Sequence, residues 1–193
     1  MDLYGRCRRW NINGLGILFV LGTLNHFLYA WSGQNALVGA FVPVNESVWE
    51  HGKLLLWPIS LWWLLGMALI RPMRAAWPQG TASDGRLRWL MGAGVSCMTA
   101  LGVMIAGFYT ITGAFGLHAL WADILLFALA LVAGQAAGLR VFSTRARRRT
   151  LYLAPAIALS LLLLASIVFT YKAPNIPLFT PPAAQTGVSE AGA

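Results

Sequence analysis

Long apolar runs separated by short polar segments form the dominant pattern along this chain. A hydrocarbon core of about 30 Å is crossed by roughly 20 apolar residues in an α-helix, and the runs have this length. The pattern therefore predicts five membrane-spanning helices, with ends placed to within about 2–4 residues. The spans are expected at 12–31, 47–70, 89–112, 118–139 and 151–171.

This pattern predicts an all-α fold, a polytopic transmembrane helix bundle formed by residues 1–172. Residues 173–193 are rich in proline, alanine and small polar residues. Because such a segment has little apolar surface to bury, we expect a disordered tail there. Within the spans, Gly134 and Gly138 form a G-x-x-x-G pattern, and Gly102 with Ala106 repeats the spacing. Both patterns predict close helix packing.

Composition supports the membrane class and excludes another. Hydrophobic residues make up 58% of the chain and charged residues 10%, against about 25% charged residues in soluble domains. The net charge is +8, which by itself is also typical of nucleic-acid binding. However, the basic residues form short clusters between the apolar runs. We therefore expect membrane lipids as partners and no nucleic acid, and the sequence names no protein partner.

The basic clusters also predict an orientation. They precede the first span and lie between the second and third and between the fourth and fifth, whereas loops 32–46 and 113–117 contain none. All basic residues except Lys53 and Lys172 thus fall on one side of the membrane. By the positive-inside rule, the N-terminus is expected in the cytoplasm and the C-terminus outside, in the cell's inner (plasma) membrane.

Acids and histidines gather near the outer ends of the spans. At ~1.5 Å of rise per residue, His26, Glu50, His51 and Asp123 share a depth of roughly 5–8 Å below the boundary. Ionisable groups in spans usually face the bundle interior, so we predict a shared pocket between spans one, two and four. The same layer contains Glu46, His118 and Tyr109.

The stretch NESVWEHGK, residues 45–53, has a structural interpretation. Ser47 and Glu50 have the spacing of a capping box, in which Ser47 caps the helix and Glu50 reaches back to the Ser47 amide. Asn45 is an alternative cap. Lys53 is placed to pair with Glu50 on the helix surface. Capping does not require a histidine at His51.

The same layer also has a chemical interpretation. His26, His51 and His118, together with Asp123 or Glu50, are the kinds of ligands that zinc accepts in catalytic sites with an open position. Either acid would then be a candidate general base. Two alternatives use the same residues: a haem held between His26 and His51, and a carrier or proton relay.

The motif also carries a resemblance. Residues 26–33, HFLYAWSG, and residues 45–53 resemble the signature of an uncharacterised family of small bacterial multipass membrane proteins. That family is characterised by an Asn-Glu-Ser-x-Trp-Glu-His-x-Lys motif and an aspartate in a later helix, here Asp123. The resemblance implies a membrane fold and points to these residues as important. It implies no activity.

A second resemblance points to chemistry. Ser47 lies four residues before His51, and the chain has three histidines and an aspartate, which is similar to the alkaline ceramidase-type membrane hydrolases. The resemblance implies zinc held by His26, His51 and His118, with Asp123 as base or ligand and Ser47 as a transition-state donor. It also implies a lipid amide or ester as substrate. Those enzymes have seven spans and a late pair of histidines, which this chain lacks.

Two functional hypotheses follow. The first is metal-dependent hydrolysis of a lipid or lipid-linked substrate in an outward-facing pocket. The second is a non-enzymatic membrane binding or assembly protein, in which the histidines and the Glu50–Lys53 pair are structural. An enzyme requires His26, His51 and Asp123 to converge on one point, whereas a structural protein requires local pairs alone. The sequence leaves the choice open.

Overall fold

The computed structural model describes residues 3–70, 82–144 and 150–181, and these contain helices and no strand. The long helices are α1 (Leu3–Trp31), α3 (Val48–Leu69), α4 (Ala82–Tyr109), α5 (Leu120–Ser143) and α6 (Thr150–Tyr171). The short elements are α2 (Ala36–Gly39), the π-helical turn η2 (Thr110–Ala114) and the 3-10 turn η3 (Pro177–Phe179). Within these described residues, five helices are long and apolar enough to cross a membrane, as predicted.

Two helices extend well beyond their predicted spans. The first span was expected to start near residue 12 and the third near residue 89, but α1 begins at Leu3 and α4 at Ala82. Hydropathy marks the apolar part of a helix, and polar turns that continue it toward water leave no such signal. At its other end, α4 continues into η2 instead of stopping at the predicted Thr112.

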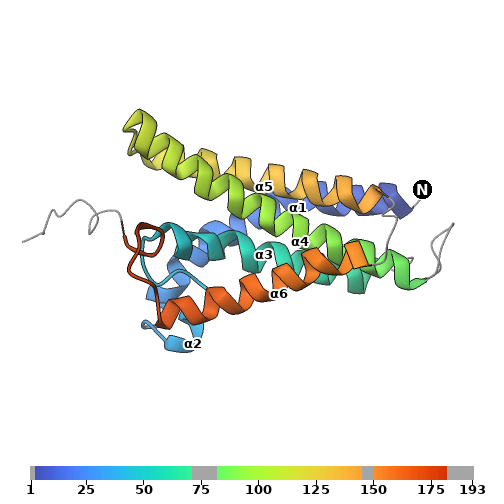
Figure 1. Ribbon diagram of the computed structural model, residues 1–193, viewed down its shortest axis with the longest axis horizontal. Coiled ribbons are helices and arrows are strands. Elements are labelled where there is room, and N and C mark those ends of the chain that lie inside the picture. Colours follow the sequence, from blue (N-terminus) through green and yellow to red (C-terminus); the bar gives the residue numbers. More distant parts are fainter. Residues whose placement is uncertain (1–2, 71–81, 145–149, 182–193) are drawn as a thin grey trace, which may run out of the picture.

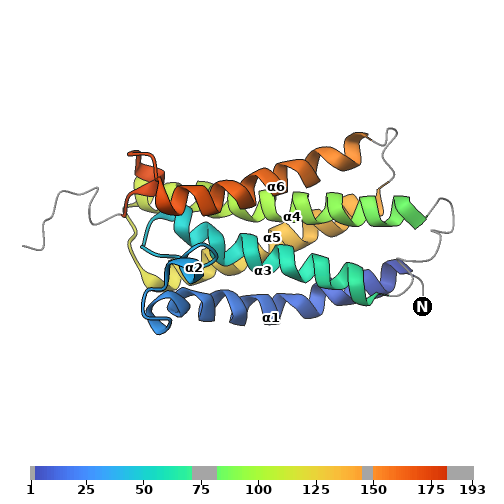
Figure 2. The same cartoon turned by 90° about the horizontal axis from the view of Figure 1, so that it is seen from below.

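The helices form an elongated bundle, with α2 at the end opposite the N-terminus (Figures 1 and 2). The end that contains α2 is called the site end below. Helix α4 lies against α3, α5 and α6, and α1 lies against α3 and α5. The apolar stretch of α3 is 56% buried and that of α6 is 6% buried. Helix α3 is therefore central, and α6 lies at the edge of the bundle.

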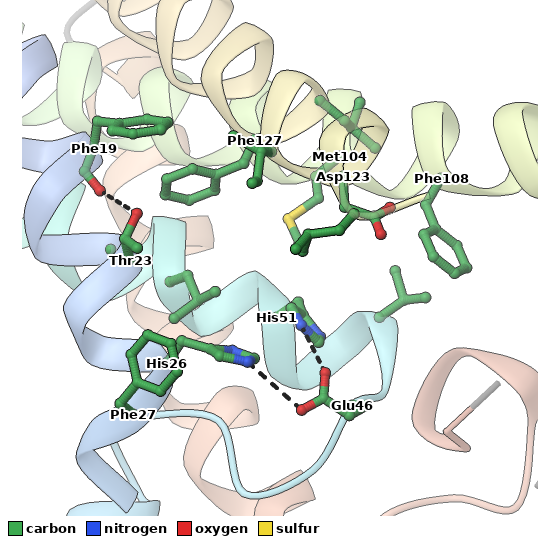
Figure 3. Close-up of a pocket in the computed structure, with 16 residues that line it drawn as sticks. Phe19, Thr23, His26, Phe27, Glu46, His51, Met104, Phe108, Asp123 and Phe127 are labelled. Atoms are coloured by element: carbon green, nitrogen blue, oxygen red, sulfur yellow. Dashed lines mark hydrogen bonds and ion pairs between the residues drawn. The ribbon is translucent and has the colours of Figure 1, made fainter. Parts of the chain in front are cut away.

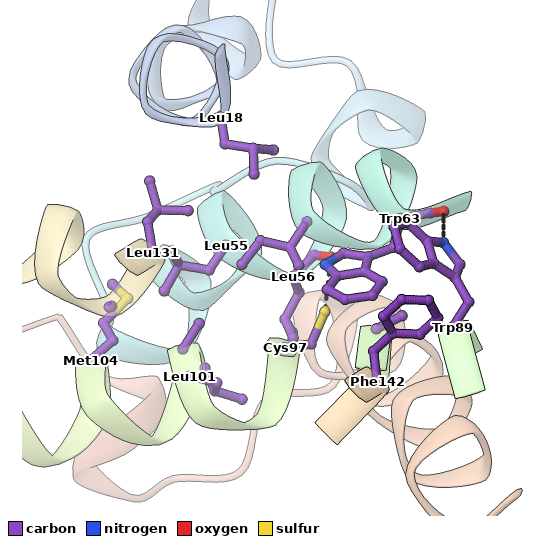
Figure 4. Packing of buried hydrophobic residues seen from close by; sticks show 14 of the residues in the cluster. Leu18, Leu55, Leu56, Trp63, Trp89, Cys97, Leu101, Met104, Leu131 and Phe142 are labelled. Carbon is purple, nitrogen blue, oxygen red and sulfur yellow. Dashed lines mark hydrogen bonds between the residues drawn. The ribbon is translucent and has the colours of Figure 1, made fainter. Parts of the chain in front are cut away.

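The core away from the site end is built from large aromatic rings (Figure 4). The Trp63 and Trp89 ring centroids lie 4.4 Å apart, and Phe142 meets Trp89 edge-on at 5.2 Å. The Trp63 Nε1–H donates to Gln135 Oε1 at 2.8 Å, and the Ser96 hydroxyl donates to the same oxygen at 3.3 Å. Gln135 thus places a hydrogen-bonded polar side chain inside the bundle, away from the site end.

Small residues bring α4 and α5 together. A Cβ added at Gly138 would lie 2.5 Å from the Gly92 carbonyl oxygen, and one added at Gly134 would lie 2.6 Å from the Ser96 carbonyl oxygen. The G-x-x-x-G prediction is confirmed on this helix. Gly102 differs, because it is exposed and a Cβ there would meet nothing within 4 Å. The seam predicted at Gly102 is wrong within this chain.

This seam gives a direct test of the packing. Gly138→Ala is expected to destabilise the protein by about 1–3 kcal/mol, because the added methyl meets backbone and forces the helices apart. Gly102→Ala is the matched control, and we expect it to be neutral or slightly stabilising because alanine favours the helix. Thermal unfolding in detergent micelles measures both. Equal effects of the two substitutions would contradict the packing described here.

The chain returns to the site end after α6. Residues 173–181, expected to begin a disordered tail, are placed against the bundle through η3. The Phe179 ring lies 5.0 Å from that of Trp49 and 5.1 Å from that of Phe169. The Tyr171 hydroxyl donates to the Ala36 carbonyl at 2.6 Å, which joins α6 to α2. Phe179 therefore packs against α3 and α6, and residues 182–193 lie outside the described part of the chain.

Candidate metal centre

The segment 32–47 connects α1 to α3 at the site end and determines where Glu46 lies. It leaves α1 through two consecutive left-handed residues, Gly33 and Gln34, with φ of 67° and 60°. Before α3, the Asn45 side chain accepts a hydrogen bond from the Ser47 amide at 2.9 Å. Ser47 then caps the helix. Glu46 is therefore held in a turn that precedes the helix, beside its first residues.

Three side chains from three segments converge there (Figure 3). His26 from α1 and His51 from α3 both direct Nε2 at the Glu46 carboxylate, at 3.7 Å from Oε1 and 3.3 Å from Oε2. The two imidazole ring centroids lie 5.3 Å apart. One nitrogen or oxygen atom from each of the three residues lies within 4.8 Å of the others, an arrangement that could hold a metal ion.

A backbone contact orients His51 for this role. Its Nδ1 lies 3.0 Å from the Ser47 carbonyl oxygen. Because a carbonyl oxygen can only accept, Nδ1 donates the hydrogen, which leaves Nε2 as the ring atom that would bind a metal ion in the cluster. Metal-binding histidines are typically fixed through the other ring nitrogen in this way. This contact with the backbone of Ser47 accounts for the four-residue spacing between Ser47 and His51.

The cluster lies at the mouth of a cavity of about 430 Å³ between α1, α3, α4 and α5. The side chains of His26 and His51 are 31% and 26% exposed, and that of Glu46 is 67% exposed. Asp123 of α5 lines the same cavity on the side away from Glu46 (Figure 3). It is close enough to His51 and His118 to interact with both electrostatically. The predicted pocket between spans one, two and four is present, with α4 as a further wall.

Two predicted pocket residues lie elsewhere. His118 is exposed in the segment between η2 and α5 and does not line the cavity. Tyr109 is exposed at the end of α4 and packs edge-on against Phe108. The third group beside His26 and His51 is therefore Glu46, where the prediction had His118. The sequence signal for Glu46 was its position two residues before α3.

Glu50 and Lys53 form a separate, buried network. Their side chains are 3% and 0% exposed, and the ammonium lies 2.7 Å from Glu50 Oε2. Lys53 also donates to the Gly39 and Val42 carbonyl oxygens at 2.8 and 3.3 Å, and to the Thr170 hydroxyl of α6. The pair therefore fastens the segment that contains Glu46 to both α3 and α6.

This network changes the roles expected for three residues. Glu50 Oε2 accepts from the Val44 amide at 3.0 Å, and the Ser47 amide donates to Asn45 Oδ1, so the reciprocal half of the predicted capping box is not formed. The other half is present, because the Glu50 amide donates to Ser47 Oγ at 3.3 Å. Ser47 is fully buried and, like Glu50 and Lys53, does not line the cavity. The positions of these three residues allow them to support the site, but they do not place their side chains where a substrate would react.

The fold and the site together define a class: a multipass α-helical membrane protein with a histidine–carboxylate cluster at one end of its bundle. Within that class, the chain belongs to DUF6512, a family of unknown function whose profile matches residues 2–187. No curated protein and no solved structure matches the chain. Membership of an uncharacterised family is thus established, while the signature motif and the ceramidase-type similarity stay predictions.

Proposed function

We propose that this protein is a metal-dependent hydrolase that acts on a lipid or lipid-linked substrate. The observation that carries the proposal is the convergence of His26, Glu46 and His51 within 4.8 Å at the mouth of a mainly apolar cavity. Concave, mostly apolar sites with a few convergent polar groups are the usual form of a small-molecule site.

The ligand types favour zinc. Two imidazoles and one carboxylate form the donor set of several catalytic zinc sites, in which a fourth position stays open for water or substrate. Zinc bound there would supply Lewis-acid polarisation of an ester or amide carbonyl. The single carboxylate also offsets part of the charge of a divalent ion. A haem fits the cluster poorly, because the Glu46 carboxylate lies beside both Nε2 atoms.

The residues around the cluster suit acyl transfer to water. Asp123 faces the cluster across the cavity and would accept a proton from the attacking water. The water oxygen would bond to the carbonyl carbon, and the carbon–oxygen or carbon–nitrogen bond to the leaving group would break. Asp123 would then return its proton to the leaving alcohol or amine, so the carboxylate is regenerated.

The proposed orientation places this site outside the cytoplasm. The positive-inside rule assigns the described arginines of α1, together with Arg86, Arg88 and Arg140, to the cytoplasmic side. The site end lies at the opposite end of the same helices. In the inner membrane of a bacterial cell, a substrate would thus reach the cavity from the outer leaflet or from the extracytoplasmic space.

A non-enzymatic role is the alternative, as a membrane binding or assembly protein. The buried Glu50–Lys53 pair favours it, because two of the three acidic and basic residues Glu46, Glu50 and Lys53 in segment 45–53 then have a structural role. That pair does not explain His26, which lies on another helix and meets Glu46 at the cavity mouth. The alternative predicts a protein that binds no metal.

Elemental analysis of the purified protein after equilibration with zinc tests the proposal. The wild type is expected to retain about one equivalent, as a single three-ligand site requires. His51→Ala removes a ligand and should lose the metal. His118→Ala is the matched control, because that histidine lies outside the cavity, and it should retain the metal. A metal-free wild type, or equal retention by both variants, would overturn the assignment.

A further inference from the structure

The cavity behind the cluster has two chemically different ends. His26, Glu46, His51 and Asp123 lie at its mouth, together with Thr23 on its wall. The remaining walls are almost entirely aliphatic or aromatic. The deep walls are formed by Phe19 and Gly22 of α1, Leu54 of α3, Met104 of α4, and Leu126 and Phe127 of α5, whereas apolar residues such as Val48 and Leu120 also border the mouth.

On α1, α3 and α5, the apolar wall extends deeper into the bundle than the polar residues at the mouth. On α1, Phe19 is seven residues before His26, which corresponds to roughly 10 Å along the axis. On α5, Phe127 is four residues beyond Asp123, or about 6 Å. Leu54 lies one turn below His51 on α3 in the same sense. The cavity is therefore a slot that leads from the cluster toward the centre of the membrane.

Two phenylalanines and a glycine close the deep end. The Phe19 and Phe127 ring centroids lie 5.7 Å apart and tilted by 46° (Figure 3). A Cβ added at Gly22 would lie 2.4 Å from Cζ of Phe127 and 3.1 Å from the Leu54 carbonyl oxygen. The Phe127 ring thus lies where any side chain larger than hydrogen at position 22 of α1 would be. Gly22 therefore determines how far the ring lies outside the slot.

We propose that this slot binds one hydrocarbon chain of the substrate and that Gly22 and Phe127 set the preferred chain length. The volume of about 430 Å³ lies near the small end of ligand sites, which range over about 300–1,000 Å³. It suits a single chain rather than a two-chain lipid. The polar mouth places the acyl carbonyl of that chain at the cluster, and in this respect the inference rests on the proposed function.

Chain-length preference tests the slot directly. The probes are octanoate, laurate and palmitate, and binding to the full-length protein in detergent is measured by native mass spectrometry. Gly22→Ala pushes Phe127 into the slot and should shift the preference toward shorter chains. Phe127→Ala opens the deep end and should shift it toward longer ones. Each methylene that gains or loses its place changes affinity by roughly fourfold.

A matched glycine on the same helix provides the control. Gly16 is exposed, and a Cβ there would meet nothing within 4 Å, so Gly16→Ala should keep the wild-type preference. Opposite shifts for Gly22→Ala and Phe127→Ala do not arise from simple loss of folding. The proposed role of the slot is overturned if both variants keep the wild-type preference. It is also overturned if Gly16→Ala causes a shift as large as theirs.

The measurement is repeated on His51→Ala to separate the slot from the chemistry. That substitution removes a proposed metal ligand but leaves the deep walls unchanged. If the shifts persist there, the slot stands whether or not hydrolysis is found. If they are absent while zinc is still retained by the wild type, the slot is wrong and the metal centre stands.

Discussion

Replacing Lys53 with methionine is expected to lower the free energy of unfolding by about 3–5 kcal/mol, the usual cost of removing one partner from a buried ion pair. Lys53 is fully buried and Glu50 is 3% exposed. Methionine fills a similar volume but leaves the Glu50 carboxylate with no cation beside it. It also removes the donor to the Gly39 and Val42 carbonyl oxygens.

The double variant Glu50→Gln/Lys53→Met identifies the cause. Glutamine removes the charge while keeping an acceptor for the Val44 amide. We therefore expect the double variant to recover most of the stability that Lys53→Met loses. Denaturant unfolding in micelles, followed by circular dichroism, measures both proteins. If the double variant is no more stable than the single one, the loss comes from packing, and the unpaired carboxylate is not responsible.

The largest expected effect on activity comes from Asp123→Asn. General acid–base catalysis typically contributes about 10²–10⁴-fold, so hydrolysis should slow by that factor. Asparagine keeps the shape of the side chain but cannot accept the proton from water. Because Asp123 lies across the cavity from Glu46, bound zinc should be retained. The rate is measured on acyl esters and amides in mixed micelles, beside zinc content for the same preparation.

Tyr109→Phe is the control for this prediction. Tyr109 is also a polar residue near the site end, but it lies outside the cavity. Its substitution should leave the rate close to that of the wild type. A rate for Asp123→Asn within a few-fold of the wild type would remove Asp123 from the mechanism. A loss of zinc together with rate would instead make Asp123 a ligand.

The fold was largely predictable because a membrane imposes a length on every span. Apolar runs of that length fix the number and order of the helices, and all five are present. The depth of polar residues was predictable for the same reason. His26, His51 and Asp123 were assigned to one layer, and they line one cavity.

The identity of the third group in the cluster was not predictable from spacing. Glu46, Glu50 and Lys53 have helical intervals, which suggests one stripe. However, α3 begins at Val48, so Glu46 is outside the helix and the interval does not apply to it. Its position depends on the path of segment 32–47, which Lys53 fixes through backbone carbonyls. Such contacts leave no periodic signal.

The rotation of each helix was equally hidden. Glu50 and His51 are neighbours in the chain, yet Glu50 pairs with Lys53 under segment 32–47, whereas His51 faces the cavity. Hydropathy gives no preference between these two directions, because both residues are polar in an apolar run. Packing decides it, through the close approach of α1 to α3 at Gly22 and the contact of Thr170 with Lys53.

The contact between Lys53 and Thr170 has a consequence for biosynthesis. Chains are made from the N-terminus onward, and Thr170 lies near the end of α6, which is synthesised after α1, α3, α4 and α5. During translation, the ammonium of Lys53 therefore lacks its Thr170 acceptor until α6 has been synthesised. The end of the bundle that contains Glu46 thus matures last, after the other four helices have been inserted.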